Sequence, residues 1–432
     1  MKTMKKTKND IELLAPAGSL EKLKYAIHYG ADAVYCGIPD VSMRARVNAF
    51  SEADFKEAAA YVHERGKKIF VTLNIYAHNY HLAKIEKHLK FLKKIGVDGV
   101  IVSDLGILSL VKKHLPGVDI HLSTQANTTN WRSAKFWYDL GVKRVVLARE
   151  VTLEDIKEIH RKVPKLELEY FVHGAMCMSY SGRCILSKWM SGKSANLGDC
   201  SQPCRWGYKK SEKQSKEVLT MSLEDVRGEH EIELEEDDHG TYFFNSKDLN
   251  LLNHLGELRE AGVMSFKIEG RNKSVFYVAS VVRAYRSVLD AVGKNLPKKE
   301  IAKVVKKELK ELDSLVNRGY TEGFLLGNEP EHNFSQSHVK ADFQFVGEIK
   351  GVENDSILIG VHNAIYPSDS LEVIGRKGIL KISIEKILDE DGKEIASAHG
   401  GQQKLFRLRL GKLGKKNKEV LEPMSLLRKV VN

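Results

Sequence analysis

Residues 68–104 read KIFVTLNIYAHNYHLAKIEKHLKFLKKIGVDGVIVSD. An apolar run at 68–74 is followed by a segment, 81–95, in which apolar residues recur three to four positions apart, and then by a second apolar run at 99–104. Continuous apolar runs separated by an amphipathic helix are typical of parallel strands covered on both faces. The stretch therefore predicts one strand–helix–strand unit of a parallel sheet.

The same unit recurs along the first 270 residues, so that eight apolar runs alternate with helical patterns. Eight such units predict an α/β fold closed into a TIM-like (β/α)₈ barrel. An open, doubly wound sheet is the competing architecture, and the count of eight argues against it. The predicted strands are Glu12–Gly18, Ala33–Ile38, Lys68–Asn74, Gly99–Asp104, Asp119–Thr124, Arg144–Glu150, Leu166–Gly174 and Ser265–Gly270.

The domain organisation follows from changes in this pattern. We expect the barrel to span residues 11–330, with an inserted cysteine-rich segment and hairpin at about 175–245 and a helical stretch at 296–330. From 335 to 432 the apolar period changes to two, which predicts a small all-β barrel domain. Its expected strands are Phe343–Gly351, Ser356–His362, Ser370–Val373, Leu380–Leu388 and Leu405–Leu410, with a turn at Asp391-Gly392.

Composition restricts the class of protein. The 432 residues are 42% hydrophobic and 29% charged. No stretch approaches the roughly 18 apolar residues of a membrane span, and no apolar core of a secretory signal follows the basic start, so we expect a cytoplasmic protein without a membrane partner. The net charge of +11 favours an anionic partner such as RNA, although charge alone is a weak indication. Part of the excess lies near the end, at Lys412, Lys415, Lys416, Lys418, Arg428 and Lys429.

Four of the five cysteines fall close together. Cys177, Cys184, Cys200 and Cys204 are separated by six, fifteen and three residues, whereas Cys36 stands alone in a predicted strand. Without an export signal a disulfide framework is not expected, and clustered thiols indicate a metal. The spacing suits an iron–sulfur cluster better than zinc, which prefers two close pairs, but zinc and buried free thiols remain open on this ground.

Residues 169–187 read EYFVHGAMCMSYSGRCILS. This stretch resembles the signature of peptidase family U-32, the collagenase-like peptidases, E-x-F-x-x-G-[SA]-[LIVM]-C-x₄-G-x-C-x-[LIVM]-S, at every constrained position. Further stretches that resemble blocks of this family are ELLAPAGS from Glu12, GADAVY from Gly30, HLSTQAN from His121, NSKDL from Asn245 and KIEGR from Lys267. The resemblance covers about residues 11–330, and the end of the chain resembles the small C-terminal β-domain of the family.

The resemblance implies RNA hydroxylation rather than proteolysis. Studied members install 5-hydroxyuridine at the tRNA wobble position or 5-hydroxycytidine in ribosomal RNA, and others take part in oxygen-independent ubiquinone hydroxylation. The family is associated with a four-cysteine 4Fe–4S cluster and with prephenate, which implies a cluster on Cys177, Cys184, Cys200 and Cys204. Length and the β-domain resemble the tRNA branch most. The expected partners are therefore tRNA, prephenate and an electron donor.

Candidate site residues are polar side chains at the predicted strand ends, where barrel enzymes place their active sites. We expect His173, Glu269 and Asp248 to serve catalysis, although a histidine there can also be structural and Asp248 or Ser246 can cap a helix. Arginine suits the two carboxylates of prephenate, and Arg149, Arg271 and Arg44 are the candidates, unless they form rim ion pairs. The expected substrate-binding set is Arg44, Asn74, Gln125, Arg149, Asn245, Lys247 and Arg271.

A peptidase and a non-enzymatic iron–sulfur scaffold are the rival functions. His63-Glu64 and His230-Glu231 are followed, four residues after each histidine, by Lys67 and Leu234, so neither forms the zinc motif H-E-x-x-H. A cysteine–histidine protease stays possible because such partners are distant in sequence. Cysteines held in a cluster are not free nucleophiles, however, so peptidase activity predicts cleavage that survives removal of the cluster.

Overall fold

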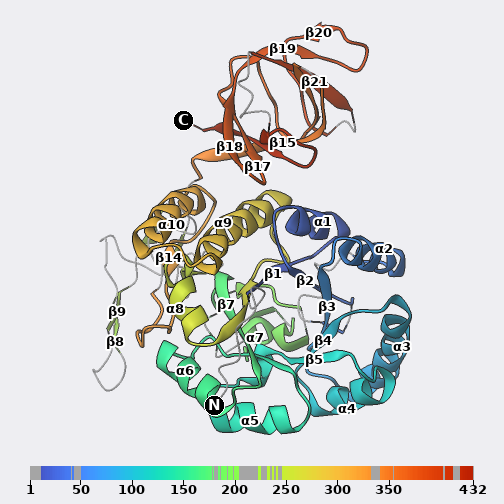
Figure 1. Cartoon of the computed structure of the whole chain (residues 1–432), viewed down its shortest axis with the longest axis vertical. Helices are drawn as coiled ribbons and strands as arrows, with labels where there is room; N and C mark the ends of the chain where they lie inside the picture. Colours follow the sequence, from blue (N-terminus) through green and yellow to red (C-terminus); the bar gives the residue numbers. More distant parts are fainter. Residues whose placement is uncertain are drawn as a thin grey trace, which may run out of the picture.

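The chain forms a closed barrel of parallel strands surrounded by helices, followed by a second, all-β unit (Figure 1). The computed structural model describes residues 11–39, 41–42, 50–177, 179, 183–184, 186–191, 193–197, 199–203, 222–224, 231–233, 236–237, 240–241, 246–331, 341–353, 355–401, 404–411 and 419–431. In this part of the chain no helix is long and apolar enough to cross a membrane.

Eight parallel strands close the barrel. They follow the order β13-β1-β2-β3-β4-β5-β6-β7, and pairing of β13 with β7 completes the ring. Each predicted apolar run overlaps one of these strands, although β13 begins two residues earlier than predicted and β7 ends one residue later. The closed TIM-like barrel is therefore confirmed and the open doubly wound sheet is excluded. The strands are β1 (Glu12–Pro16), β2 (Ala33–Gly37), β3 (Lys68–Leu73), β4 (Gly99–Val102), β5 (Asp119–Leu122), β6 (Arg144–Val146), β7 (Glu167–Ala175) and β13 (Val263–Ile268).

Helices cover the outside of the barrel. Polar residues fix where several of them begin: Ser51 and Thr152 each form a capping box with an aspartate three residues later, which satisfies backbone N–H groups of the first turn. The helices are α1 (Leu20–His28), α2 (Glu52–His63), α3 (Asn79–Ile95), α4 (Leu105–His114), α5 (Trp131–Asp139), α6 (Leu153–Lys162), α8 (Leu255–Glu260), α9 (Val275–Gly293) and α10 (Lys298–Asp313).

The strands are buried on both faces, as their continuous apolar sequences predict. Tyr35, Phe70 and Ile101 belong to a small buried cluster separate from the main core. Their chain neighbours Val34 and Ile69 belong to the main core, which also includes buried residues of the helices. Successive side chains of each strand thus alternate between the two clusters.

The insertion after β7 differs from the sequence-based expectation at one point. Asn245-Ser-Lys-Asp was expected to open a helix, with Asp248 or Ser246 as its cap, but Asp248–Asn250 is a strand, β12. It pairs antiparallel with His173–Ala175 of β7 and parallel with β14 (Tyr320–Thr321). The reason is that β7 has nine residues and outruns its barrel neighbours, so its last backbone groups need another partner.

The expected inserted hairpin is present as two short antiparallel pairs. Strand β8 (Ser222–Glu224) pairs with β9 (Glu231–Glu233), and β10 (Glu236–Asp237) pairs with β11 (Gly240–Thr241). The cysteine-rich part contains α7 (Leu186–Ser191) and a short 3₁₀ turn, Ala195–Leu197. The expectation that all of 296–330 is helical is wrong, because α10 ends at Asp313 and the chain then extends into β14.

The C-terminal unit is an antiparallel eight-stranded sheet in the order β18-β17-β22-β15-β16-β21-β19-β20, so its all-β character is confirmed. The expected run Leu380–Leu388 contains most of one strand and all of the next. The Asp391-Gly392 turn joins β19 to β20, as expected. The strands are β15 (Phe343–Val352), β16 (Ser356–Val361), β17 (Leu371–Gly375), β18 (Gly378–Ile382), β19 (Ile384–Leu388), β20 (Glu394–Ile395), β21 (Leu405–Leu410) and β22 (Leu426–Val430).

This sheet rests against the barrel helices α1, α9 and α10 (Figure 1). The hydroxyl of Tyr29, the residue directly after α1, donates to the Ile374 carbonyl at 2.6 Å. Phe276 of α9 stacks on Phe345 with ring centroids 5.4 Å apart. Arg428 pairs with Glu311 of α10 at 2.8 Å and with Glu372 of its own sheet at 2.6 Å. The β-domain is therefore held to the side of the barrel by both apolar and charged contacts.

Candidate active site

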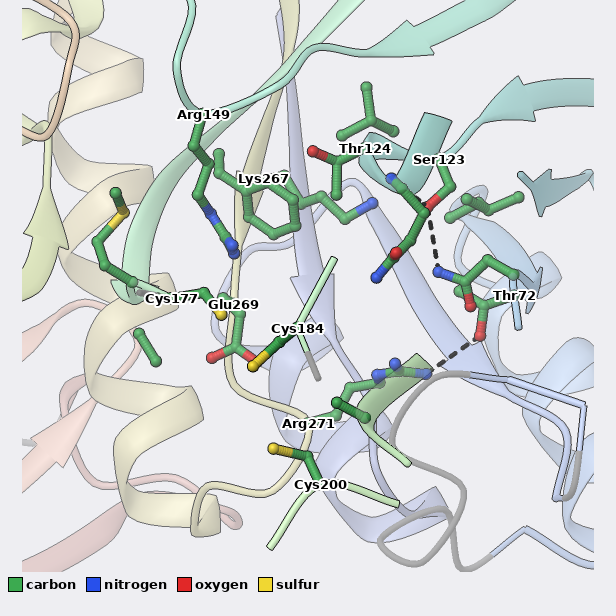
Figure 2. A pocket seen from close by; sticks show the side chains of 18 of the residues that line it. Thr72, Ser123, Thr124, Arg149, Cys177, Cys184, Cys200, Lys267, Glu269 and Arg271 are labelled. Atoms are coloured by element: carbon green, nitrogen blue, oxygen red, sulfur yellow. Dashed lines mark hydrogen bonds between the residues drawn. The ribbon is translucent and has the colours of Figure 1, made fainter. Parts of the chain in front are cut away.

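A cavity of about 140 Å³ lies at the carboxyl ends of the barrel strands (Figure 2). Two parts of the chain form it: the ends of β2 to β7 and β13, and the cysteine-rich segment that follows β7. This is the face on which (β/α)₈ barrels build active sites. Its lining from the strands and their ends includes Tyr35, Thr72, Asn74, Ile101, Ser123, Gln125, Arg149, Phe171, Lys267, Glu269 and Arg271.

Three of the four clustered cysteines face this cavity. Cys177, Cys184 and Cys200 all line it, and none of them forms a disulfide. Figure 2 shows their sulfur atoms on the side of the cavity where the Glu269 carboxylate lies. The fourth cysteine, Cys204, lies outside the described residues, directly after the lining residue Pro203.

These thiols fit an iron–sulfur cluster as a donor set, because clusters are held by cysteine thiolates. Cys177 is exposed and the other two are half-buried, so an incoming cluster can reach all three. Within the described residues no three cysteine, histidine or carboxylate side chains are spaced to hold a metal ion. Cys36 is different: it is fully buried in β2, and burial raises the pKa of its thiol to about 12.

Three cationic side chains enter the cavity, one from the end of β6 and two from β13 and its end (Figure 2). Arg149 follows β6 and lies over the Phe171 ring, with its guanidinium carbon 4.2 Å from the ring centroid. Arg271 follows β13 and donates from Nη1 to Thr72 Oγ1 at 3.1 Å. Lys267 lies within β13. With Glu269 as the acidic residue of the lining, the cavity carries an excess of positive charge and suits an organic anion.

Lys267 was not among the residues expected from the sequence. Its ammonium is buried and donates to the fully buried Glu169 carboxylate at 2.6 Å. Burial lowers the pKa of Lys267, while the Glu169 charge acts in the opposite direction. The sequence does contain a signal for Lys267, because side chains two residues apart on a strand share a face. Lys267, Glu269 and Arg271 follow this spacing, and all three line the cavity.

An uncharged polar group forms another part of the wall. Asn74 Nδ2 donates to Ser123 Oγ at 3.1 Å, and the Gln125 backbone N–H donates to the same hydroxyl at 3.3 Å. The Gln125 side chain is buried, and its Oε1 has no hydrogen-bond partner among the described residues. An unpaired buried acceptor is costly, which is typical of a position completed by a ligand or water.

His173 lies outside this cavity, although the sequence suggested a catalytic position beside the cysteines. The pairing of β13 with β7 shifts register between Lys267/Phe171 and Ile268/His173, so β7 has one extra residue there. Such a bulge re-aims the side chains that follow it. The His173 ring contacts Tyr277, Tyr285 and Tyr320, and its Nδ1 is 3.2 Å from the Tyr285 hydroxyl.

Asp248 and Lys247 also lie outside the cavity. Asp248 is buried in an ion pair with Arg318 and lies in β12, the strand that pairs with the end of β7. Lys247 pairs with Glu331. Two further candidates, Arg44 and Asn245, are outside the described residues. The structure thus brings together Asn74, Gln125, Arg149, Glu269, Arg271 and three cysteines, and it adds Lys267.

The fold and this cavity define a barrel protein with a cysteine-lined, cationic site at its mouth. The model of peptidase family U32 matches residues 18–335, and the model of the family's C-terminal domain matches residues 341–428. The chain belongs to this family.

Named relatives align with nearly the whole chain. The tRNA hydroxylation protein P of Haemophilus influenzae is 37% identical and covers 91% of this chain and 92% of its own. The Escherichia coli protein of the same name is 38% identical, with coverages of 90% and 91%. A 23S rRNA 5-hydroxycytidine synthase of Escherichia coli is 33% identical and covers 86% of this chain but 53% of its own.

Proposed function

We propose that this chain hydroxylates tRNA, at C5 of the wobble uridine, in a prephenate-dependent reaction that uses a 4Fe–4S cluster. The observation that carries the proposal is the single cavity in which three free thiols and three cationic side chains meet. Relatives named tRNA hydroxylation proteins, which align with about nine-tenths of the chain, support tRNA as the substrate.

In this proposal the cationic side chains bind prephenate. Arg149 and Arg271 reach the cavity from β6 and β13, and each can hold a carboxylate through two parallel N–H groups. Lys267, anchored on Glu169, supplies a third positive charge deeper in β13. Two carboxylates on one small molecule match this charge better than a neutral substrate does, because Arg149 and Arg271 can then each face a carboxylate.

The cluster, held by Cys177, Cys184, Cys200 and Cys204, would supply electrons or a Lewis-acidic iron for a step that needs a redox centre. Glu269 is the candidate proton acceptor, because its carboxylate lines the cavity on the cysteine side (Figure 2). Asn74 and Gln125 offer amide groups that match the edge of a nucleobase. We propose an electron donor as a further partner, because a cluster that gives up electrons has to be reduced again before the next turnover.

The β-domain is proposed to bind an arm of the RNA. Of the basic residues near the end of the chain, Arg428 and Lys429 are engaged in ion pairs, with Glu372 and Asp369 respectively. In this proposal RNA binding by the β-domain therefore depends on Lys412, Lys415, Lys416 and Lys418, which lie outside the described residues. If these four lysines contact phosphates, replacing them with alanine reduces the salt dependence of tRNA binding. An unchanged dependence would remove this assignment.

Ribosomal RNA is the second candidate substrate, favoured by the 5-hydroxycytidine synthase among the relatives. A peptidase, the historical activity of the family name, would need a nucleophile that works without the cluster. Three of the clustered cysteines line one cavity, where a bound cluster would occupy them.

The test is mass spectrometry of nucleosides from cells with and without this gene. The proposal predicts that 5-hydroxyuridine and its derivatives disappear from the tRNA of the deletion strain and return with the wild-type gene. Unchanged tRNA together with loss of 5-hydroxycytidine would move the substrate to ribosomal RNA. If both RNAs are unchanged, the hydroxylase proposal is wrong.

A further inference from the structure

A group of exposed aromatic rings lies where α3 begins. Among the residues that the structure describes, Tyr80 is the most exposed large apolar side chain, with 71% of its surface accessible. The neighbouring helix α4 begins with Leu105, which is 56% exposed. Single exposed apolar residues are ordinary, but several at one end of two adjacent helices indicate a binding surface.

The rings are arranged as a platform rather than scattered. His78 and Tyr80 are nearly parallel, with centroids 5.5 Å apart and an angle of 5° between their planes. Tyr80 and His81 have centroids 4.0 Å apart. The His78 backbone N–H donates to His81 Nδ1 at 2.9 Å, which fixes both residues at the helix start. We call His78, Tyr80 and His81 the rim platform.

The platform lies next to the candidate active site along the chain. Asn74, directly after β3, lines the cavity, and four residues separate it from the first turn of α3. Helices in this barrel start on the side of the strands' carboxyl ends, so the platform stands at the mouth. Residues 74–85 contain no aspartate or glutamate, and His78, His81 and Lys84 are their ionisable cationic groups. The surface is thus aromatic, with His81 tilted by 38° against Tyr80, and compatible with a polyanion.

We infer that the rim platform stacks the base of an unpaired nucleotide next to the one that enters the cavity. This inference rests on the proposed function. A base that is turned into the cavity leaves its neighbours without a stacking partner, and proteins that bind single-stranded RNA provide aromatic rings for such bases. A protein partner is the other conceivable occupant, but the lack of acidic residues within 74–85 and the chain's charge of +11 favour RNA.

The experiment measures tRNA modification and base stacking separately, using the full-length protein with its cluster. Two RNAs with the anticodon arm carry 2-aminopurine on one or the other side of the wobble uridine, and its fluorescence reports stacking. Tyr80→Ala should abolish the quenching at one of the two positions and raise the KM for tRNA about tenfold with kcat within twofold, since one stacked base contributes on this order. Tyr80→Trp should retain both properties.

Phe136→Ala is the matched control, because Phe136 is 58% exposed on α5 and packs edge-on against Trp137. It should behave as wild type. If Tyr80→Ala retains quenching and KM while the wild type modifies tRNA, the platform is wrong and the function stands. If the wild type quenches through Tyr80 but leaves tRNA unmodified, the platform stands and the hydroxylation proposal fails. A wild-type protein that quenches neither RNA also overturns the inference.

Discussion

Two arginines at opposite ends of β6 have opposite surroundings. Arg144, at the start of the strand, is buried among three carboxylates, with contacts of 2.5 Å to Glu12, 2.8 Å to Glu167 and 3.3 Å to Glu169. Arg149, just beyond the other end, lies over Phe171, and its buried Nε has no hydrogen-bond partner among the described residues. A cation surrounded by carboxylates stabilises the folded state, whereas a cation that faces a cavity is available to a ligand.

The largest effect should come from the cysteines that line the cavity at the carboxyl ends of the barrel strands. Serine at Cys177, Cys184 or Cys200 should abolish both the visible absorbance of the cluster and tRNA hydroxylation, because each thiol faces the cavity. Cys36→Ala is the control, since this thiol is buried in β2 away from the lining. Cluster absorbance that survives all three single substitutions would contradict the assignment.

The next prediction exchanges each arginine of β6 for methionine. Arg144→Met leaves the carboxylates around it without this positive charge. It should lower the free energy of unfolding by about 3–5 kcal/mol, measured by chemical denaturation. Arg149→Met should leave stability within about 1 kcal/mol of wild type but raise the KM for prephenate roughly tenfold or more, as expected for loss of a charge-assisted hydrogen bond. If the two variants change stability and KM alike, the contrast between a structural Arg144 and a ligand-binding Arg149 is wrong.

A smaller effect concerns His173, which the bulge turns away from the cavity. Burial lowers its pKa to about 4, against opposing effects of Asp248 and Glu269 and with a further lowering by Lys273. The folded state therefore holds the neutral ring. Its contribution is fully present above the ordinary pKa of about 6.5 and is lost as the pH falls toward 4, by about 3 kcal/mol in total.

The His173 contribution can be isolated by denaturant titrations of wild type and His173→Gln at pH 7 and pH 4.5. The variant should lose less stability than wild type over this interval, and it should keep most of its activity at pH 7. Equal losses would show that His173 does not titrate as described. A hundredfold loss of activity with intact folding would instead restore the catalytic role suggested by the sequence.

The fold could be predicted because apolar runs and helical periods report burial directly. Each of the eight runs overlaps a barrel strand, and residues at strand ends such as Asn74, Gln125, Arg149 and Arg271 do meet in one cavity. Strand alternation within KIEGR also groups Lys267 with Glu269 and Arg271, although only Glu269 and Arg271 are among the expected site residues.

The rest depended on pairing between distant segments, which periodicity does not report. A one-residue bulge turns His173 away, and the length of β7 makes Asp248 a strand residue instead of a helix cap. Arg318 lies 70 residues from Asp248 in the chain, so no local pattern indicates their ion pair. Such contacts between distant segments decide whether a polar residue lines the cavity or is paired inside the protein.

The most direct test of the central claim uses the purified protein with its cluster reconstituted and reduced, mixed with tRNA from the deletion strain. We predict 5-hydroxyuridine at the wobble position in the presence of prephenate, and none when prephenate is omitted or Cys177 is replaced by serine. Formation of 5-hydroxyuridine without prephenate, or its absence despite intact cluster absorbance and tRNA binding, would contradict the account.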